Sequence, residues 1–371
     1  MPCATRRDHT VTRMPPAHDS QHGLLQAVLG APGDVQRRAI AKSITLLEST
    51  RPDHRARAQR LLTDVLPHAG GAFRLGISGV PGVGKSTFIE ALGLTLIARG
   101  HRVAVLTVDP SSSVSGGSIL GDKTRMERLS VHAQAYVRPS PTGGALGGVA
   151  ARTREAMLVC EAAGYDIVVV ETVGVGQSET AVAAMTDMFV LLQLPNAGDE
   201  LQAIKKGVME LADLVVINKA DLDPVAATRA QAQIVSSLRL LRQSGSPELA
   251  QHDDRRWQPQ VLQASALLVQ GMDAFWEAVL RFRDLQSAAG ALAHRRREQA
   301  LAWMWERIES GLRQSFREDP HVAAAMQTTR QAVADGTMVG SLAAQSLLDL
   351  FARVHGRPLD RSQSLDAGSA G

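Results

Sequence analysis

The feature that most constrains the fold is a glycine-rich turn between an apolar run and a helical pattern, in the stretch FRLGISGVPGVGKSTFIEALG. Gly79, Gly84, Lys85 and Ser86 have the spacing G-x-x-x-x-G-K-S of a phosphate-binding loop. The glycines let backbone N–H groups turn towards phosphate oxygens, and the helix that follows adds its dipole. A strand before this loop and a helix after it are the context that the motif requires.

The rest of the chain continues the alternation of strand and helix. Short runs rich in β-branched residues are separated by longer stretches with helical periodicity, such as 86–98 and 201–211. This alternation predicts an α/β fold, with a mostly parallel sheet covered by helices on both faces. The predicted strands are the apolar runs 73–77, 103–108, 167–170, 188–194, 214–217 and 261–262.

The two ends of the chain differ from this central part. The segment 34–66 has the pattern of two amphipathic helices broken near Pro52, and the strand runs stop after about residue 271. The expected organisation is a disordered tail over 1–22, a helical extension over 23–70, a nucleotide-binding domain over 71–270, a helical arm over 271–356, and a second disordered tail over 357–371.

Composition narrows the class of protein. The chain has 371 residues, 44% of them hydrophobic and 21% charged, which are ordinary globular values. A net charge of +3 and an aromatic content of 4% argue against a nucleic-acid partner. Cys3 and Cys160 cannot build a disulfide framework and fit a reducing cytoplasm. No apolar run approaches the roughly 20 residues of a membrane span, and none follows Arg6 and Arg7 as in a secretory signal.

A second motif indicates which base is bound. Asn218, Lys219, Ala220 and Asp221 follow the apolar run in LADLVVINKADL. A carboxylate at Asp221 can accept hydrogen bonds from both N1–H and the exocyclic amine of guanine, whereas adenine offers no such donor pair. Alone, this tetrapeptide also fits an ordinary solvated loop, but behind a phosphate-binding loop and a strand it predicts GTP. The tripeptide 265–267 after the last predicted strand resembles the loop whose backbone contacts guanine O6.

Acidic residues at strand ends suggest a magnesium site. Asp109 and Glu171 each end an apolar run, and Asp122 follows a serine- and glycine-rich segment. Mg²⁺ prefers hard oxygen ligands, so these carboxylates and the hydroxyl of Ser86 form the predicted ligand set. The polar segment before Asp122 suits a switch that orders on the γ-phosphate and Mg²⁺. Asp122 also fits a second reading, the N-cap of a helix that begins at Lys123.

The position of glutamine predicts slow catalysis. Many GTPases place a water-orienting glutamine directly after the glycine of D-x-x-G. Here the tetrapeptide is Glu171-Thr172-Val173-Gly174, the next residue is Val175, and the first glutamine is Gln177. Gln177 is therefore the candidate for positioning water, beside Lys85 and Glu171 as the other predicted catalytic residues. Without a glutamine next to Gly174, we expect slow turnover until a partner binds.

Six motifs in order resemble the MeaB-type GTPases, which are chaperones of adenosylcobalamin-dependent acyl-CoA mutases such as methylmalonyl-CoA mutase. These proteins are relatives of the human methylmalonic aciduria type A protein. The resemblance covers about residues 35–355 and explains the glutamate at 171, because a glutamate in the ExxG tetrapeptide is typical of that group. The motifs are GVPGVGKST, VDPSSSVSGGSILGDKTRM, RPSPTGGALGGVA, ETVGVGQSE, LPNAGDELQAIKKGVMELAD and NKAD.

The resemblance implies a P-loop NTPase core with helical N- and C-terminal extensions, and a homodimer formed through the C-terminal arm. It implies that GTP binding and hydrolysis to GDP gate cofactor loading onto the mutase and protect or reactivate it. The Mg²⁺ ligands would be Ser86, Asp109, Asp122 and Glu171. The nucleotide contacts would be Gly79, Val80, Pro81, Gly82, Val83, Gly84, Lys85, Ser86, Thr87, Asn218, Lys219, Asp221, Ser265, Ala266 and Leu267.

Two further segments have two readings each. Residues 196–206 resemble a switch that relays the nucleotide state to the mutase, but Asp199 and Glu200 also suit an ordinary helix start. The apolar stripe within 301–312, which includes Leu301 and Leu312, fits either the chain's own core or a dimer surface.

Three other functions fit the sequence less well than the mutase chaperone. A metallochaperone GTPase would be expected to have a His/Cys-rich tract, whereas the 11 histidines here are scattered. A small-molecule kinase of the arginine/ornithine-transport type would not need Asn218 and Asp221. A purely structural P-loop module would not need the serine- and glycine-rich segment.

Overall fold

The computed structural model describes residues 17–49, 51–108, 126–138, 146–172, 178–196, 206–243 and 257–356. The chain divides into two compact units, Met1–Gln299 and Ala300–Gly371. Helix α13 (Ala291–Glu318) contributes its first residues to the first unit and the remainder to the second.

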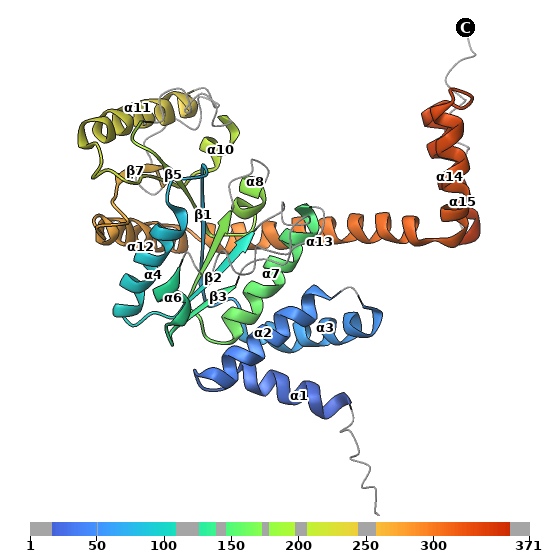
Figure 1. The fold of residues 1–371 in the computed structure, drawn as a ribbon, viewed down its shortest axis with the longest axis horizontal. Coiled ribbons are helices and arrows are strands. Elements are labelled where there is room, and N and C mark those ends of the chain that lie inside the picture. Colours follow the sequence, from blue (N-terminus) through green and yellow to red (C-terminus); the bar gives the residue numbers. More distant parts are fainter. Residues whose placement is uncertain are drawn as a thin grey trace, which may run out of the picture. The chain divides into compact units, whose positions relative to one another are not determined.

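A parallel sheet forms the centre of the first unit (Figure 1). Its strand order among the described residues is β3-β2-β4-β1-β5-β6-β7, with every neighbouring pair parallel. The predicted α/β fold is therefore confirmed. The strands are β1 (Phe73–Gly79), β2 (Val103–Val108), β3 (Ala135–Arg138), β4 (Ile167–Thr172), β5 (Met188–Gln193), β6 (Leu214–Ile217) and β7 (Gln260–Gln263).

Strand β3 is absent from the sequence-based prediction. It has four residues, Ala135–Arg138, of which only the first three are apolar. At the edge of the sheet it pairs with β2 alone, and this pairing makes it a strand. So short an apolar run carries no periodicity that could distinguish it from a turn.

Helices cover both faces of the sheet with apolar side chains. One face packs against α4 (Lys85–Ala98), α6 (Glu127–Val131) and α12 (Met272–Ala288). The other packs against α7 (Leu146–Ala162), α8 (Ser178–Ala183), α10 (Lys206–Leu211) and α11 (Pro224–Gln243). Because both faces are covered, the strand sequences are continuous apolar runs and do not alternate between apolar and polar residues.

Three helices precede the sheet: α1 (Ala17–Val28), α2 (Asp34–Glu48) and α3 (Pro52–Val65), followed by a 3₁₀ turn at Leu66–His68. The predicted break at Pro52 is confirmed, since proline suits the first turn of a helix. Helix α1 begins inside the segment expected to be a disordered tail. In the sequence of α1, the large apolar residues Leu24, Leu25 and Val28 all follow Gly23, so no periodicity is visible earlier.

The C-terminal region also differs from expectation. The predicted arm begins at residue 271, but α12 packs Phe275, Trp276 and Phe282 into the core of the first unit. The second unit contains the rest of α13, α14 (Pro320–Ala334) and α15 (Gly340–Val354). None of the described helices is long and apolar enough to cross a membrane.

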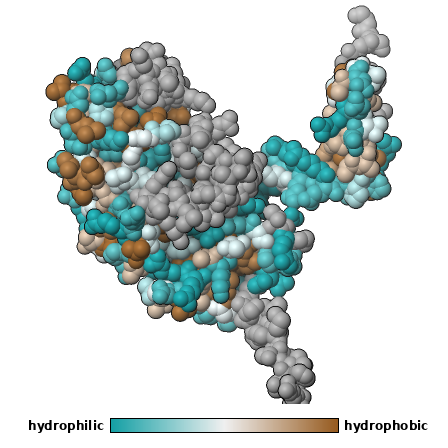
Figure 2. All heavy atoms as spheres, viewed as in Figure 1, coloured by the Kyte–Doolittle hydropathy of each residue, from teal (hydrophilic) through white to brown (hydrophobic). Residues whose placement is uncertain are grey.

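Within the second unit, apolar residues are both buried and exposed. The rings of Phe316 and Phe351 meet edge to face with centroids 5.5 Å apart, and Val322 is fully buried. In Figure 2, hydrophobic residues are also visible on the surface of α14 and α15. The apolar stripe of α13 is exposed; it consists of Leu301, Met304, Trp305, Ile308 and Leu312.

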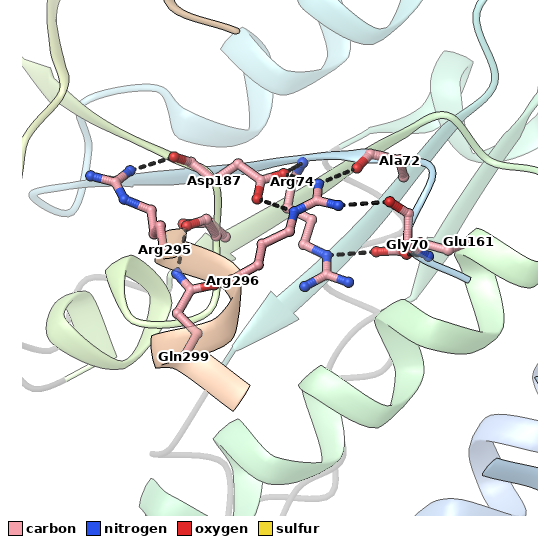
Figure 3. A network of polar contacts seen from close by, with 9 residues as sticks. Gly70, Ala72, Arg74, Glu161, Asp187, Arg295, Arg296 and Gln299 are labelled. Carbon is pink, nitrogen blue, oxygen red and sulfur yellow. Dashed lines mark hydrogen bonds and ion pairs between the residues drawn. The ribbon is translucent and has the colours of Figure 1, made fainter. Parts of the chain in front are cut away.

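Polar contacts fix the start of α13 beneath the amino-terminal ends of β1 and β5 (Figure 3). Arg296 donates to both carboxylate oxygens of Asp187 at 2.7 and 2.5 Å, and to the carbonyls of Gly70 and Ala72. We call the group Asp187, Arg295, Arg296 and Gln299 the α13 anchor. Arg295 pairs with Asp213 at 3.0 Å, and the Gln299 amide donates to the Thr186 carbonyl at 2.9 Å.

Candidate functional site

The glycine-rich loop joins β1 to α4 at the carboxyl edge of the sheet. Gly79, Gly82 and Gly84 have φ values of 154°, 81° and 91°, a region that side-chain-bearing residues rarely occupy. A Cβ on Gly79 would lie 2.6 Å from the Leu192 carbonyl oxygen, and one on Gly84 would lie 2.8 Å from the Asn218 amide nitrogen. Glycine is thus required at both positions by conformation and by space.

Lys85 is the first residue of α4, and its side chain turns back over the loop. Its ammonium group donates to the carbonyl of Gly79 at 2.8 Å and to that of Val80 at 3.3 Å. The residue is 8% exposed. The loop therefore holds a buried cation against its own backbone, where charged phosphate oxygens would be stronger acceptors than carbonyls.

Ser86 and Glu171 come together although they are far apart in sequence. The Ser86 hydroxyl donates to the Glu171 carboxylate at 3.2 Å, and Glu171 is 4% exposed. The sheet register aligns Glu171 with Ile77 of β1 and Thr107 of β2. Two hard oxygen groups thus meet at the loop, as a magnesium site needs.

The other residues predicted for metal binding and catalysis, Asp109, Asp122 and Gln177, lie outside the described residues. Within the part of the chain that the structure describes, no group of three His, Cys, Asp or Glu side chains could hold a metal. The described half of the predicted magnesium set is therefore Ser86 and Glu171.

Asn218 connects the glycine-rich loop to the loop that follows β7. Its side-chain nitrogen donates to the Val83 carbonyl at 2.9 Å, and its side-chain oxygen accepts from the Ala266 backbone N–H at 3.1 Å. It is 1% exposed. Lys219, with φ 59°, adds a hydrogen bond from its ammonium group to the Gly82 carbonyl at 2.8 Å. These two residues hold three loops in one arrangement.

Asp221 differs from its neighbours in this network. Its side chain is half-buried, and no described residue donates a hydrogen bond or forms an ion pair with its carboxylate. The loop beside it is fixed: the Ala220 N–H donates to the Ala264 carbonyl at 3.1 Å, and Ser265 bridges to Gln270. Leu267 is 77% exposed. A fixed loop with an unpaired acceptor is suited to recognising a ligand with two adjacent N–H donors.

Two contacts at the site could not be read from sequence motifs. The Ser78 and Thr172 hydroxyls hydrogen-bond at 2.8 Å inside the sheet, joining the strands that carry the phosphate loop and Glu171. The link from Asn218 to Val83 is the other. Both residues of each pair are buried, and only the strand order brings them together.

The comparison with protein families decides the class of this site. A family described as "Methylmalonyl Co-A mutase-associated GTPase MeaB" matches residues 40–321. The chain belongs to the MeaB family. The resemblance inferred from the six motifs is confirmed, and the chain is a P-loop GTPase, a class that binds GTP and GDP.

Similar proteins match most of the length of this chain. A "Putative GTPase" of Caulobacter vibrioides is 54% identical over 315 residues, which cover 85% of this chain and 94% of that protein. The "Methylmalonic aciduria type A homolog, mitochondrial" of Mus musculus is 46% identical, over 86% of this chain and 78% of the relative. The crystal structure of a "LAO/AO transport system kinase" has a TM-score of 0.69 and 36% identity, covering 91% of this chain and 99% of that one.

Proposed function

We propose that this GTPase serves an adenosylcobalamin-dependent acyl-CoA mutase. GTP binding and hydrolysis would gate loading of the cobalamin onto the mutase and protect or reactivate the enzyme. The support is the family match, whose description names methylmalonyl-CoA mutase, together with relatives named for methylmalonic aciduria.

The base-side residues would select guanine, and the unpaired Asp221 carboxylate is the observation that carries this proposal. N1–H and the amine of guanine would donate to that carboxylate, while the backbone at 265–267 would face O6. Asn218 would hold the base loop against the phosphate loop, because it bonds to both Val83 and Ala266. An adenine base would leave Asp221 without its donors, and such a mismatch in a polar site discriminates strongly.

On the phosphate side, Lys85 would transfer its hydrogen bonds from the Gly79 and Val80 carbonyls to β- and γ-phosphate oxygens. Ser86, Asp109, Asp122 and Glu171 would hold Mg²⁺, and the Ser86–Glu171 contact of 3.2 Å supports half of this set. The metal would neutralise charge that develops on the phosphates during hydrolysis. Gln177 would orient the attacking water.

Catalysis would depend on the partner. No glutamine follows Gly174 directly, so a mutase that orders the segment 196–206 and the region around Gln177 would supply transition-state stabilisation that the chain lacks alone. The exposed apolar stripe of α13 would form the surface of a homodimer. Light scattering tests this second point: a monomer at micromolar concentration, unchanged by nucleotide, contradicts the dimer.

A steady-state hydrolysis assay tests the function. GTP and ATP are compared with and without the methylmalonyl-CoA mutase of the same organism. We expect slow hydrolysis of GTP alone, a rise of about tenfold with the mutase, which corresponds to roughly 1.4 kcal/mol, and no comparable ATP hydrolysis. Lys206→Ala should reduce the rise and leave GTP affinity unchanged. Equal turnover with and without every candidate mutase would contradict the proposed chaperone role.

Asp221→Asn tests the base assignment separately. The amide offers a donor where the carboxylate accepts, so GTP affinity should fall at least tenfold while xanthosine triphosphate binds better than GTP. Equal calorimetric affinity of the unmodified protein for ATP and GTP would contradict the role of Asp221.

A further inference from the structure

The three N-terminal helices line an open pocket that the nucleotide site does not use. It has a volume of about 760 Å³ and is lined from α1, α2 and α3. These helices lie together on one side of the first unit (Figure 1). We call this pocket the basic groove and define it by Leu24, Ala27, Arg38, Ala39, Lys42 and Arg57.

The charged side chains of the basic groove are cationic. Arg38, Lys42 and Arg57 line it, and its described lining contains no carboxylate. Arg38 and Lys42 are exposed and form no hydrogen bond or ion pair with any described residue. Two carboxylates of α2 and α3 are engaged elsewhere: Glu48 pairs with Arg138 at 2.7 Å, and Asp53 pairs with Arg51. Arg38 and Lys42 therefore present positive charge that no described side chain pairs with.

The floor of the basic groove is apolar. Ala39 and Leu46 of α2 are buried there, and Leu24 and Ala27 of α1 are half-buried. At the mouth, Val35 is 71% exposed. An apolar floor beneath a basic rim fits a ligand that has apolar and anionic groups on the same side.

The groove is held in shape by contacts with the sheet domain. The Gln36 amide, 2% exposed, donates to the carbonyls of Val28, Gly30 and Ala163, and accepts from Arg102 at 2.8 Å. At the other end of α2, the Glu48–Arg138 pair joins the helix to the end of β3. A partner would therefore meet a preformed surface, which lowers the entropy cost of binding.

The spacing of the cations selects the kind of ligand. Arg38 and Lys42 are four residues apart on one helix, so their Cβ atoms lie about 5–6 Å apart on the same face. Two acidic residues one turn apart on a second helix match this spacing, and an apolar residue between them would reach the floor. The open mouth, with Val35, Arg38 and Lys42 all exposed, favours a helix laid along the groove over an enclosed small molecule.

We propose that the basic groove binds an acidic amphipathic helix of the mutase. This inference rests on the proposed function, because it names the surface by which the same partner docks. It places part of the interface on α1–α3, separate from the nucleotide loops.

The test uses charge reversal with a matched control. Arg38→Glu with Lys42→Glu changes two groove cations, and Arg55→Glu with Arg60→Glu changes two exposed cations of α3 that do not line the groove. Both variants alter the net charge equally, so a general electrostatic effect would appear in both. Circular dichroism confirms that each is folded.

The first measurement is the mutase concentration that gives half-maximal stimulation of GTP hydrolysis. It should rise at least tenfold for the groove variant and less than twofold for the control, with basal hydrolysis unchanged in both. Val35→Glu should shift it in the same direction. Equal shifts in groove and control variants, or none in the groove variant, overturn the inference while leaving the proposed function intact.

The second measurement does not depend on stimulation. Fluorescence anisotropy follows the full chain binding a labelled helical peptide with Glu at two positions one turn apart and Leu between them. Saturable binding should weaken at least tenfold in the groove variant, and a peptide with Lys in place of Glu should not bind. If this peptide binds but no mutase stimulates the unmodified chain, the proposed function and the mutase assignment fall together. If the peptide does not bind, the groove itself is not a helix-binding site.

Discussion

Removing Arg296 from the α13 anchor should destabilise the protein strongly. The Asp187 side chain is 0% exposed, and Arg296 donates to both of its carboxylate oxygens. In Arg296→Ala, the Arg74 backbone N–H would still donate to that carboxylate at 2.8 Å. Breaking one partner of a buried ion pair typically costs about 3–5 kcal/mol, because the other charge stays buried without compensation.

This free energy converts into a measurable shift of the melting temperature. At roughly 2 °C per kcal/mol for a domain of this size, Arg296→Ala should lower Tm by about 6–10 °C. Arg297→Ala is the matched control, since Arg297 is exposed and forms no hydrogen bond or ion pair with described residues. Thermal unfolding followed by circular dichroism measures both variants.

A double-mutant cycle assigns the loss to the pair. Asp187→Asn removes the buried charge, so adding it to Arg296→Ala should recover part of the stability, with a coupling of about 1–3 kcal/mol. If Arg296→Ala melts within 2 °C of Arg297→Ala, the anchor does not stabilise the fold and the reasoning from burial is refuted.

Three further predictions come from local geometry. Gly76→Ala should lower Tm, because its Cβ would lie 2.7 Å from the Thr186 hydroxyl and 2.8 Å from a Val182 methyl; a Tm equal to that of Gly207→Ala, where the Cβ would meet open space, contradicts this. Asp319 caps α14 through the N–H groups of Val322 and His321, and these bonds with the His355 contact lower its pKa. A lowered folded pKa means stability that is present above about pH 4 and lost as the pH falls further. Asp319→Asn should therefore make the helical circular-dichroism signal less dependent on pH below about pH 4, and an unchanged pH dependence argues against this. Burial raises the pKa of the Cys160 thiol, so mass spectrometry should find it unalkylated by iodoacetamide at pH 8 until the chain unfolds.

Much of the fold could be predicted because both faces of the sheet are covered. Buried strands such as β4 and β5 become apolar runs with sharp ends, and those runs appear directly in the sequence. Strand β3 and helix α1 could not be found this way. The first is defined by its pairing with β2, and the second by apolar residues confined to its last two turns.

The candidate site shows the same division. Gly79, Gly84 and Lys85 could be identified because backbone conformation and charge dictate the residue type at each position. The link that Asn218 makes between Val83 and Ala266 depends on the order of β1, β6 and β7 in space, which a motif does not contain. The α13 anchor could not be predicted for the same reason, because in the sequence its arginines look like those of any solvent-exposed basic helix.

The central place of β1 has a consequence for synthesis of the chain on the ribosome. β1 is the first strand to be made, yet its neighbours begin only at Ile167 and Met188. At about 5–20 residues per second, the stretch from Phe73 to Ile167 takes roughly 5–20 s to make, and β1 has no pairing partner during that time. On the proposed site, GTP would not stabilise the nascent chain until Asn218 and Ala266 have emerged. β1 is therefore an apolar strand that stays without a partner, and open to aggregation, during this part of translation.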